Sequence, residues 1–221
     1  MGLVTVLGLV TVLGLEKQES RKPGEKMIKY TSIKELCDTA ERQGIKISEL
    51  CLKDQAEQMQ KSEEEIYSIM ERNFEVMLES VSKGNDPNLR STSGLTGGEG
   101  NKMLNYAEKT NGGLSGKFLT KAIGRAMCVS NCNAAMGRIV ATPTAGSCGI
   151  LPGCLVSMYE DRGFAKRDVV MSIFTAGAFG MVIAEKASIA GAEGGCQAEC
   201  GSASGMAAAA LVELMGGSPK A

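Results

Sequence analysis

Glycine is distributed very unevenly along this chain of 221 residues, and its distribution constrains the fold. Residues 84–221 hold 23 of the 28 glycines, whereas residues 16–83 hold 27 charged side chains in 68 positions. Glycine lets one backbone approach another, or a ligand, closely, and no sustained alternation of β-branched and polar residues follows the first 15 positions. The chain is therefore predicted to be all-α or mainly α, with closely packed Ala/Gly/Met-rich helices and Gly/Ser/Thr-rich ligand loops between them.

Composition divides the chain into three segments. Residues 1–26 contain the hexapeptide GLVTVL twice, followed by a charged stretch, and are predicted to be an N-terminal extension that is disordered or non-native. They lack a cationic start and a small-residue cleavage site, although a membrane anchor or export signal stays open as the alternative. Residues 27–84 form a charged amphipathic helical segment, and residues 85–221 form a Gly-rich helical region.

Local signals mark where helices begin and end. Ser32 and Ser48 are predicted N-caps, Ser62 forms a capping box with Glu65, and Gly84 ends that helix. Further helices are expected at 101–110, 115–132, 150–161 and 165–188. Gly-rich loops are expected at 85–100, 142–149 and 191–205. No stretch is predicted to be long and apolar enough to span a membrane.

The composition excludes several classes of function. Lys and Arg total 24 and Asp and Glu total 25, so no basic face is expected for a nucleic acid or an anionic membrane. The chain has no His, which removes His general bases, Ser-His and Cys-His pairs and His-ligated metal sites. It has no Trp, and its four Tyr and five Phe leave little material for base-stacking surfaces.

Two of the Gly-rich loops precede helices and are candidate anion sites. They are STSGLTGGEG (91–100) and TPTAGSCG (142–149). Free backbone N–H groups and the helix dipole favour an anion at such a position. Neither loop contains GxxxxGK[ST] or a strand-linked GxGxxG. Each alone is more often a helix connector, but together they indicate a small carboxylate rather than a nucleotide.

The eight Cys residues indicate free thiols rather than a disulfide framework, and a cytoplasmic location is expected. Cys128 and Cys132 lie four residues apart in a predicted helix, where a buried Cys behaves as a small hydrophobe. Cys196 lies in the Gly-rich run 191–205, where backbone N–H groups favour a thiolate and therefore a metal or a cluster. Cys200 is a second candidate ligand beside Cys196, but a spacing of four residues in a loop is not specific for a metal site.

Four runs of the sequence are similar to one known enzyme family. They are IKELCDTAERQGIKISEL, SGLTGGEGNKM, NAAMGRIVATPTAGSCGILPG and FTAGAFGMVIAEKASIAGAEGGCQAECGSASGMAAAALVELMGG. Together they resemble the alpha subunit of the iron–sulfur-dependent L-serine dehydratases over about residues 27–219. The resemblance implies deamination of L-serine to pyruvate and ammonia with a four-iron four-sulfur (4Fe-4S) cluster and without pyridoxal phosphate. In that family three Cys hold the cluster, and its open iron acts as a Lewis acid on the leaving hydroxyl.

The resemblance assigns roles position by position. Cys196, in GGCQAE, matches the first cluster cysteine, whereas the other two belong to a CDPV…VPC segment downstream, which this sequence does not reach before Ala221. Residues 85–221 are therefore expected to be the catalytic region, incomplete at the C-terminus, with the remaining ligands in a missing segment. Cys148 and Cys200 stand where the family often has other residues, so neither is a motif-backed ligand. The loops match segments that line the family's substrate pocket and give these substrate-binding candidates: Ser93, Thr96, Gly97, Gly98, Asn133, Thr142, Thr144 and Ser147.

The catalytic base and the partners stay open at this level. Lys102, a Ser or Thr alkoxide and a cluster-polarised group are candidates for the base, and a Schiff-base role for Lys102 is disfavoured. The resemblance implies L-serine as substrate and a homo- or hetero-oligomer that can include a beta subunit. The alternatives are a degenerate, non-catalytic subunit that binds a partner chain or a carboxylate, and a zinc or thiol-redox protein that uses the CxxxC pairs.

Overall fold

The computed structural model describes residues 6–8 and 29–221, and most of this part of the chain is helical. The α-helices are α2 (Ile33–Gln43), α3 (Ile47–Met59), α4 (Glu63–Gly84), α5 (Glu99–Thr110), α6 (Gly116–Ala134), α7 (Ile150–Arg162), α8 (Lys166–Lys186) and α9 (Gly191–Leu214). The other regular elements of the described residues are the 3-10 helix η2 (Gly113–Ser115) and the strands β1 (Val6–Gly8) and β2 (Ile139–Ala141). The predicted mainly α fold is confirmed.

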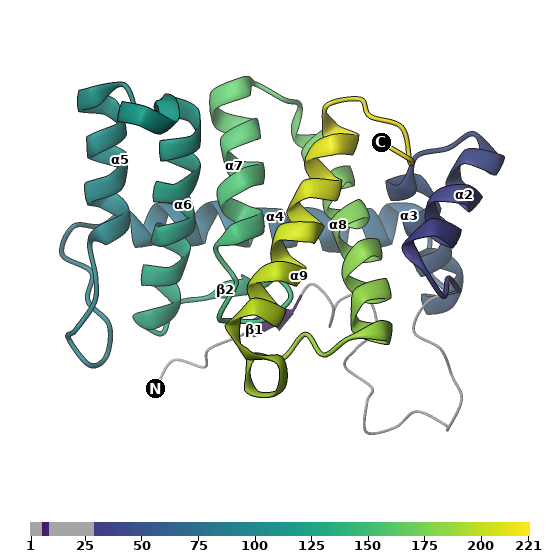
Figure 1. The fold of residues 1–221 in the computed structure, drawn as a ribbon, viewed down its shortest axis with the longest axis horizontal. Helices are drawn as coiled ribbons and strands as arrows, with labels where there is room; N and C mark the ends of the chain where they lie inside the picture. The colour runs from purple at the N-terminus through teal and green to yellow at the C-terminus, as the bar shows by residue number, and fades with distance from the viewer. Residues whose placement is uncertain (1–5, 9–28) are drawn as a thin grey trace.

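Helices α5 to α9 run in alternating directions, and the long helix α4 crosses behind them (Figure 1). α5 packs on α6, α6 on α7 and α8 on α9, while α4 contacts α6, α7 and α8. The alternation gathers the connecting segments at two opposite ends of the layer. The lower end in Figure 1 carries residues 85–98, 135–149 and 187–190 and the start of α9, and we call it the loop end. We call the opposite end of α5, α6 and α7 the ion-pair end.

Two of the predicted helix starts and one predicted end are confirmed. Ser32 accepts a hydrogen bond from the backbone N–H of Glu35 at 3.1 Å, which satisfies a free donor at the start of α2. Ser62 and Glu65 form the expected capping box at the start of α4, and that helix ends at Gly84. These signals act within one helical turn, so the sequence alone is enough to recognise them.

The predicted N-cap at Ser48 is wrong. The N-cap of α3 is Lys46, two residues earlier, and the Ser48 hydroxyl is buried without a partner among the described residues. The Glu213 carboxylate of α9 instead accepts the Ser48 backbone N–H at 3.1 Å and the Thr175 hydroxyl at 2.7 Å. The start of α3 is therefore capped both locally, by Glu49 accepting the Lys46 backbone N–H at 3.1 Å, and by the distant Glu213, which no local pattern could reveal.

The core lies between α4 and the helices in front of it. Phe74 of α4 is fully buried, and its ring meets Tyr159 of α7 edge-on with 5.5 Å between ring centroids. A Cβ added at Gly84 would lie 1.8 Å from the carbonyl oxygen of Cys128. A Cβ added at Gly100 would lie 2.5 Å from the Cys128 Sγ atom. Cys128 is fully buried, and burial raises its pKa to about 12, so its interpretation as a small hydrophobe is confirmed.

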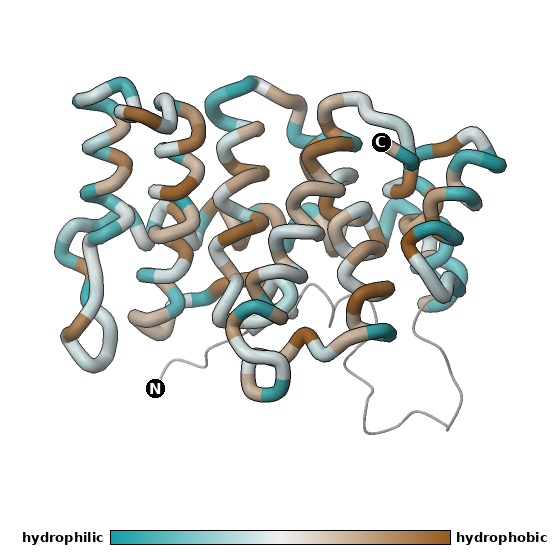
Figure 2. The backbone as a smooth tube through the Cα atoms, in the orientation of Figure 1, coloured by the Kyte–Doolittle hydropathy of each residue, from teal (hydrophilic) through white to brown (hydrophobic). Residues whose placement is uncertain are grey.

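α8 corrects the expectation that no stretch is apolar enough for a membrane span. By length and composition, Lys166–Lys186 passes as such a span. In this structure, however, 67% of its most apolar window is buried by other parts of the protein. Figure 2 shows pale to brown colour along much of α8 and α9, in contrast to the teal on α2. Packing in the helical core accounts for the apolar composition of α8, since a helix that is apolar all round needs to be covered.

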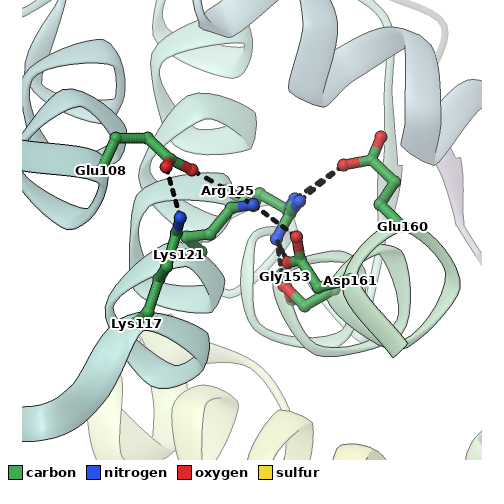
Figure 3. Close-up of polar contacts among 8 residues, drawn as sticks. Glu108, Lys117, Lys121, Arg125, Gly153, Glu160 and Asp161 are labelled. Carbon is green, nitrogen blue, oxygen red and sulfur yellow. Dashed lines mark hydrogen bonds and ion pairs between the residues drawn. The ribbon is translucent and has the colours of Figure 1, made fainter. Parts of the chain in front are cut away.

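Charged side chains join α5, α6 and α7 at the ion-pair end (Figure 3). Arg125 is 4% exposed; it pairs with Glu160 at 2.6 Å and also with Asp161. Lys121 pairs with Asp161 and, at 3.4 Å, with Glu108. Burial alone would raise the pKa of Asp161, but the hydrogen bonds from Arg125 and Lys121 outweigh it and lower that pKa below its ordinary value. Opposite charges on three helices are thus matched at this end.

Part of the predicted N-terminal extension has a partner in the fold. β1 (Val6–Gly8) pairs in parallel with β2 (Ile139–Ala141), with Leu7 opposite Val140. The rest of residues 1–26 lies outside the described residues, and the division of the chain at residues 26 and 84 stays a prediction.

Candidate functional site

The loop 142–149 is folded by hydrogen bonds among the side chains that the sequence selects. The Ser147 hydroxyl donates to the Thr142 carbonyl at 3.0 Å and lies 3.2 Å from the Thr144 hydroxyl. Asn133, at the end of α6, donates its amide N–H to the carbonyl of Ala145 at 3.2 Å. Thr142 and Ser147 are buried, whereas Asn133 and Thr144 are half-buried. Four of the eight predicted substrate-binding residues therefore lie together at the loop end.

A carboxylate that the sequence interpretation missed belongs to the same group. Glu199 of α9 accepts a hydrogen bond from the Thr144 hydroxyl at 2.7 Å. This contact joins the loop 142–149 to α9 across 55 positions of sequence. Glu199 lies three residues after Cys196, a spacing that puts both on one face of a helix. The signal was present in CQAEC, but the prediction of a loop at 191–205 obscured it.

Residues 191–205 are not a loop, which corrects the predicted environment of Cys196. α9 includes them, and Gly195 alone departs from helical geometry, with φ 73° and ψ 177°. Cys196 directly follows this break and is exposed, and Cys200 follows one turn later. Burial and the neighbouring Cys196 and Glu199 raise the pKa of Cys200. The thiol of Cys196 is therefore accessible, about one helical turn before the Glu199 side chain that contacts the loop 142–149.

The loop 91–98 carries the other four predicted substrate-binding residues. Ser93 and Thr96 are exposed, Gly97 is half-buried and Gly98 is buried. The backbone N–H of Thr92 donates to the carbonyl of Ala134 at 3.2 Å, next to Asn133. The loops 91–98 and 142–149 are thus both bonded to the C-terminal end of α6.

The start of α5 already holds an anion of its own. The backbone N–H of Gly97 donates to the Glu99 carboxylate at 2.8 Å, and the Asn131 amide donates to it at 2.7 Å. The backbone N–H groups of Gly97 and Glu99, followed by Asn131, lower the pKa of Glu99. An external carboxylate at Gly97 would have to displace this side chain. Lys102 is exposed one turn later on α5, and its role as a base stays a prediction.

The thiols do not converge on one point in the described part of the chain. Cys128 and Cys132 are fully buried in α6, and Cys148 is buried with its pKa raised to about 12 by burial. Among the described residues, no group of three or more His, Cys, Asp or Glu side chains is arranged to hold a metal ion. A cluster that requires three thiolates is therefore not completed by these residues, which offer Cys196 and its neighbour Cys200 at the loop end.

Comparisons with known proteins point to one family. Residues 42–221 match the family described as serine dehydratase alpha chain. A probable L-serine dehydratase alpha chain from Bacillus subtilis is 44% identical over 191 residues, covering 86% of this chain and 63% of the relative. The L-serine dehydratase alpha chain of Peptoniphilus asaccharolyticus is 42% identical over 186 residues, covering 83% and 63%. An L-serine dehydratase of Streptomyces coelicolor is 38% identical over 193 residues, covering 84% and 41%. The chain thus spans less than two thirds of the length of these relatives.

Proposed function

Because the chain belongs to the serine dehydratase alpha chain family, we propose that it takes part in the deamination of L-serine to pyruvate and ammonia. The observation that carries this proposal is the hydrogen bond between Thr144 and Glu199, which holds the loop 142–149 beside the helix of Cys196. Hydroxyl and N–H groups suit an amino-acid carboxylate, and a thiolate suits iron. The relatives named alpha chain support a beta chain as partner within an oligomer.

The burial of the loop residues separates two roles within the proposed site. Asn133 and Thr144 are half-buried and can contact a substrate, as can the exposed Ser93 and Thr96. Thr142 and Ser147 are buried, and their hydrogen bonds shape the loop. The substrate carboxylate would thus meet the second amide N–H of Asn133, since Thr144 donates its one hydroxyl proton to Glu199, while the two buried residues keep the loop in place.

We further propose that Cys196 supplies one thiolate to a 4Fe-4S cluster in the complete protein. The remaining thiolates would come from outside the described residues, since these do not complete a set of three. Lewis-acid activation of the serine hydroxyl depends on that completed set. The 221-residue chain alone should consequently hold no stoichiometric cluster. A cytoplasmic location is also proposed, supported by eight free cysteines, which a reducing compartment maintains.

A completed chimera tests the proposal. The chain is fused to the segments of the Bacillus subtilis relative that it does not span, and a beta chain from that organism is supplied. After anaerobic reconstitution, the chimera should bind iron and sulfide and form pyruvate from L-serine. Cys196→Ser should abolish pyruvate formation and release iron, because an alkoxide is a poor ligand for an iron–sulfur cluster.

The matched control is Cys128→Ala, at a thiol buried in the core. It should keep iron and activity and lose about 1 kcal/mol of stability through a small cavity. Pyruvate formation that survives Cys196→Ser would contradict the cluster assignment. A folded, iron-loaded chimera that forms no pyruvate from L-serine would contradict the proposed reaction.

A further inference from the structure

The Glu199 carboxylate lies against two glycines, Gly146 and Gly191. A Cβ added at Gly146 would lie 2.4 Å from the Glu199 Oε1 atom, and one added at Gly191 would lie 2.9 Å from Oε2. The Thr144 hydroxyl donates to Oε2 at 2.7 Å. Larger residues at either glycine would therefore displace the carboxylate from the loop. The loop 142–149 and the start of α9 thus both leave room for this one side chain, and the loop also binds it.

The two carboxylate oxygens differ in their contacts. Oε2 accepts the Thr144 hydroxyl, whereas Oε1 accepts no hydrogen bond within residues 6–8 and 29–221, and no ion pair there includes Glu199. Two other acidic side chains at the loop end are already bonded: Glu99 accepts through both oxygens, and Glu193 accepts from Ser188 at 2.7 Å. A half-buried carboxylate with one oxygen available is suited to a cationic ligand group.

We propose that Oε1 of Glu199 binds the ammonium group of the amino-acid substrate and so makes the site select amino acids over hydroxy acids. This inference rests on the proposed function. An α-amino acid presents a carboxylate and an ammonium group only a few bonds apart. Thr144 contacts the carboxylate of Glu199 and belongs to the loop proposed to bind the substrate carboxylate. The ammonium group of the substrate thereby meets Glu199, and its carboxylate meets the N–H donors of the adjoining loop end, such as the Asn133 amide.

The test compares two ligands that differ in a single group. L-serine carries an ammonium group where L-glycerate carries a hydroxyl, and both bind without chemistry when no metal is supplied. Binding to the 221-residue chain is measured by calorimetry and by ligand-observed NMR. Glu199→Gln should weaken L-serine binding about tenfold or more and leave L-glycerate unchanged, because Gln still accepts the Thr144 hydroxyl but carries no charge.

Two further variants complete the experiment. Glu193→Gln, on the same helix, is the matched control and should bind both ligands as the wild type does. Glu199→Asp keeps the charge and should keep the preference for L-serine, so the inference stays testable if the Gln variant does not fold. Circular dichroism establishes which variants are folded.

Each remaining outcome overturns the inference in a distinguishable way. Equal weakening of both ligands by Glu199→Gln would show that Glu199 acts only by holding the loop. Unchanged L-serine binding would refute the ammonium contact and leave the proposed function standing. A wild-type chain that binds neither ligand would refute the inference that these residues bind an amino acid, whereas the chimera tests the proposed function separately.

Discussion

The two ends of the helical layer use opposite chemistry. At the ion-pair end, Arg125 and Lys121 meet the carboxylates of Glu160, Asp161 and Glu108, so neighbouring charges are matched (Figure 3). At the loop end, Glu199 accepts a hydrogen bond from the Thr144 hydroxyl, and the described residues provide this carboxylate with no cation. The first arrangement fixes the helices to one another, whereas the second leaves binding capacity for a ligand.

The comparison explains how one small layer of helices can be stable and still bind a ligand. Matched buried charges are costly to disturb because each would be left without its partner. A partly bonded group such as Glu199 contributes less to stability and more to recognition. Substitutions at the ion-pair end should therefore change stability, and substitutions at the loop end should change binding.

The largest stability effect is expected from Arg125→Met. It removes a nearly buried cation, leaving Glu160 without its ion pair and Asp161 with Lys121 alone, at an expected cost of about 3 kcal/mol in the free energy of unfolding. Urea denaturation measures the change. The control at the same end is Lys117→Met, since Lys117 and Glu108 are both solvent-exposed and should contribute less than about 1 kcal/mol. Equal effects of the two substitutions would remove the distinction between a matched buried pair and a surface pair.

Lowering the pH is expected to have a smaller effect on the free energy of unfolding. The pKa of Asp161 is lowered in the folded protein from its ordinary value of 3.8, so its ionised form stabilises the fold above that pH. This contribution is lost as the pH falls through the lowered folded pKa. The free energy of unfolding, followed from about pH 5 downward, should therefore decrease less steeply in Asp161→Asn than in the wild type. If the free energy of unfolding falls equally with pH in both proteins, the pKa of Asp161 does not differ between the folded and unfolded states.

The smallest effect is expected from the N-terminus. Deleting residues 1–26 removes β1, whose three residues pair with Ile139–Ala141 just before the loop 142–149. The few backbone hydrogen bonds of such a pair are worth about 1 kcal/mol, so the melting temperature should fall by about 2–4 °C. Helical content by circular dichroism should stay the same. A large loss of the helical signal would contradict this prediction, because it would show that the fold depends on residues 1–26.

The sequence predicts those parts of the fold that local rules control. The capping box of Ser62 and Glu65 and the end of α4 at Gly84 depend on neighbours within one turn. Ser48 fails as a cap because Glu213, from the far end of the described chain, satisfies the start of α3. Tertiary contacts of this kind leave no trace in a sequence window.

The candidate site was predicted in part for the same reason. The loop 142–149 was recognisable from its Gly, Ser and Thr content, and the structure places Asn133 beside it. Glu199 was missed because the glycines of 191–205 favour a loop by propensity, whereas packing of α9 on α7 and α8 makes most of that run helical. Tertiary packing overrode local preference at the point where the carboxylate is presented.

The cap that Glu213 provides has a consequence for synthesis on the ribosome. The start of α3 leaves the ribosome well before Glu213, which lies 165 positions later. At chain-elongation rates of about 5–20 residues per second, the delay is roughly 8–33 s. During that interval the backbone N–H of Ser48 has to be satisfied by water, so the start of α3 stays solvated until the end of α9 emerges. The start of α3 is thus expected to be sensitive to proteases in the nascent chain until α9 has been made.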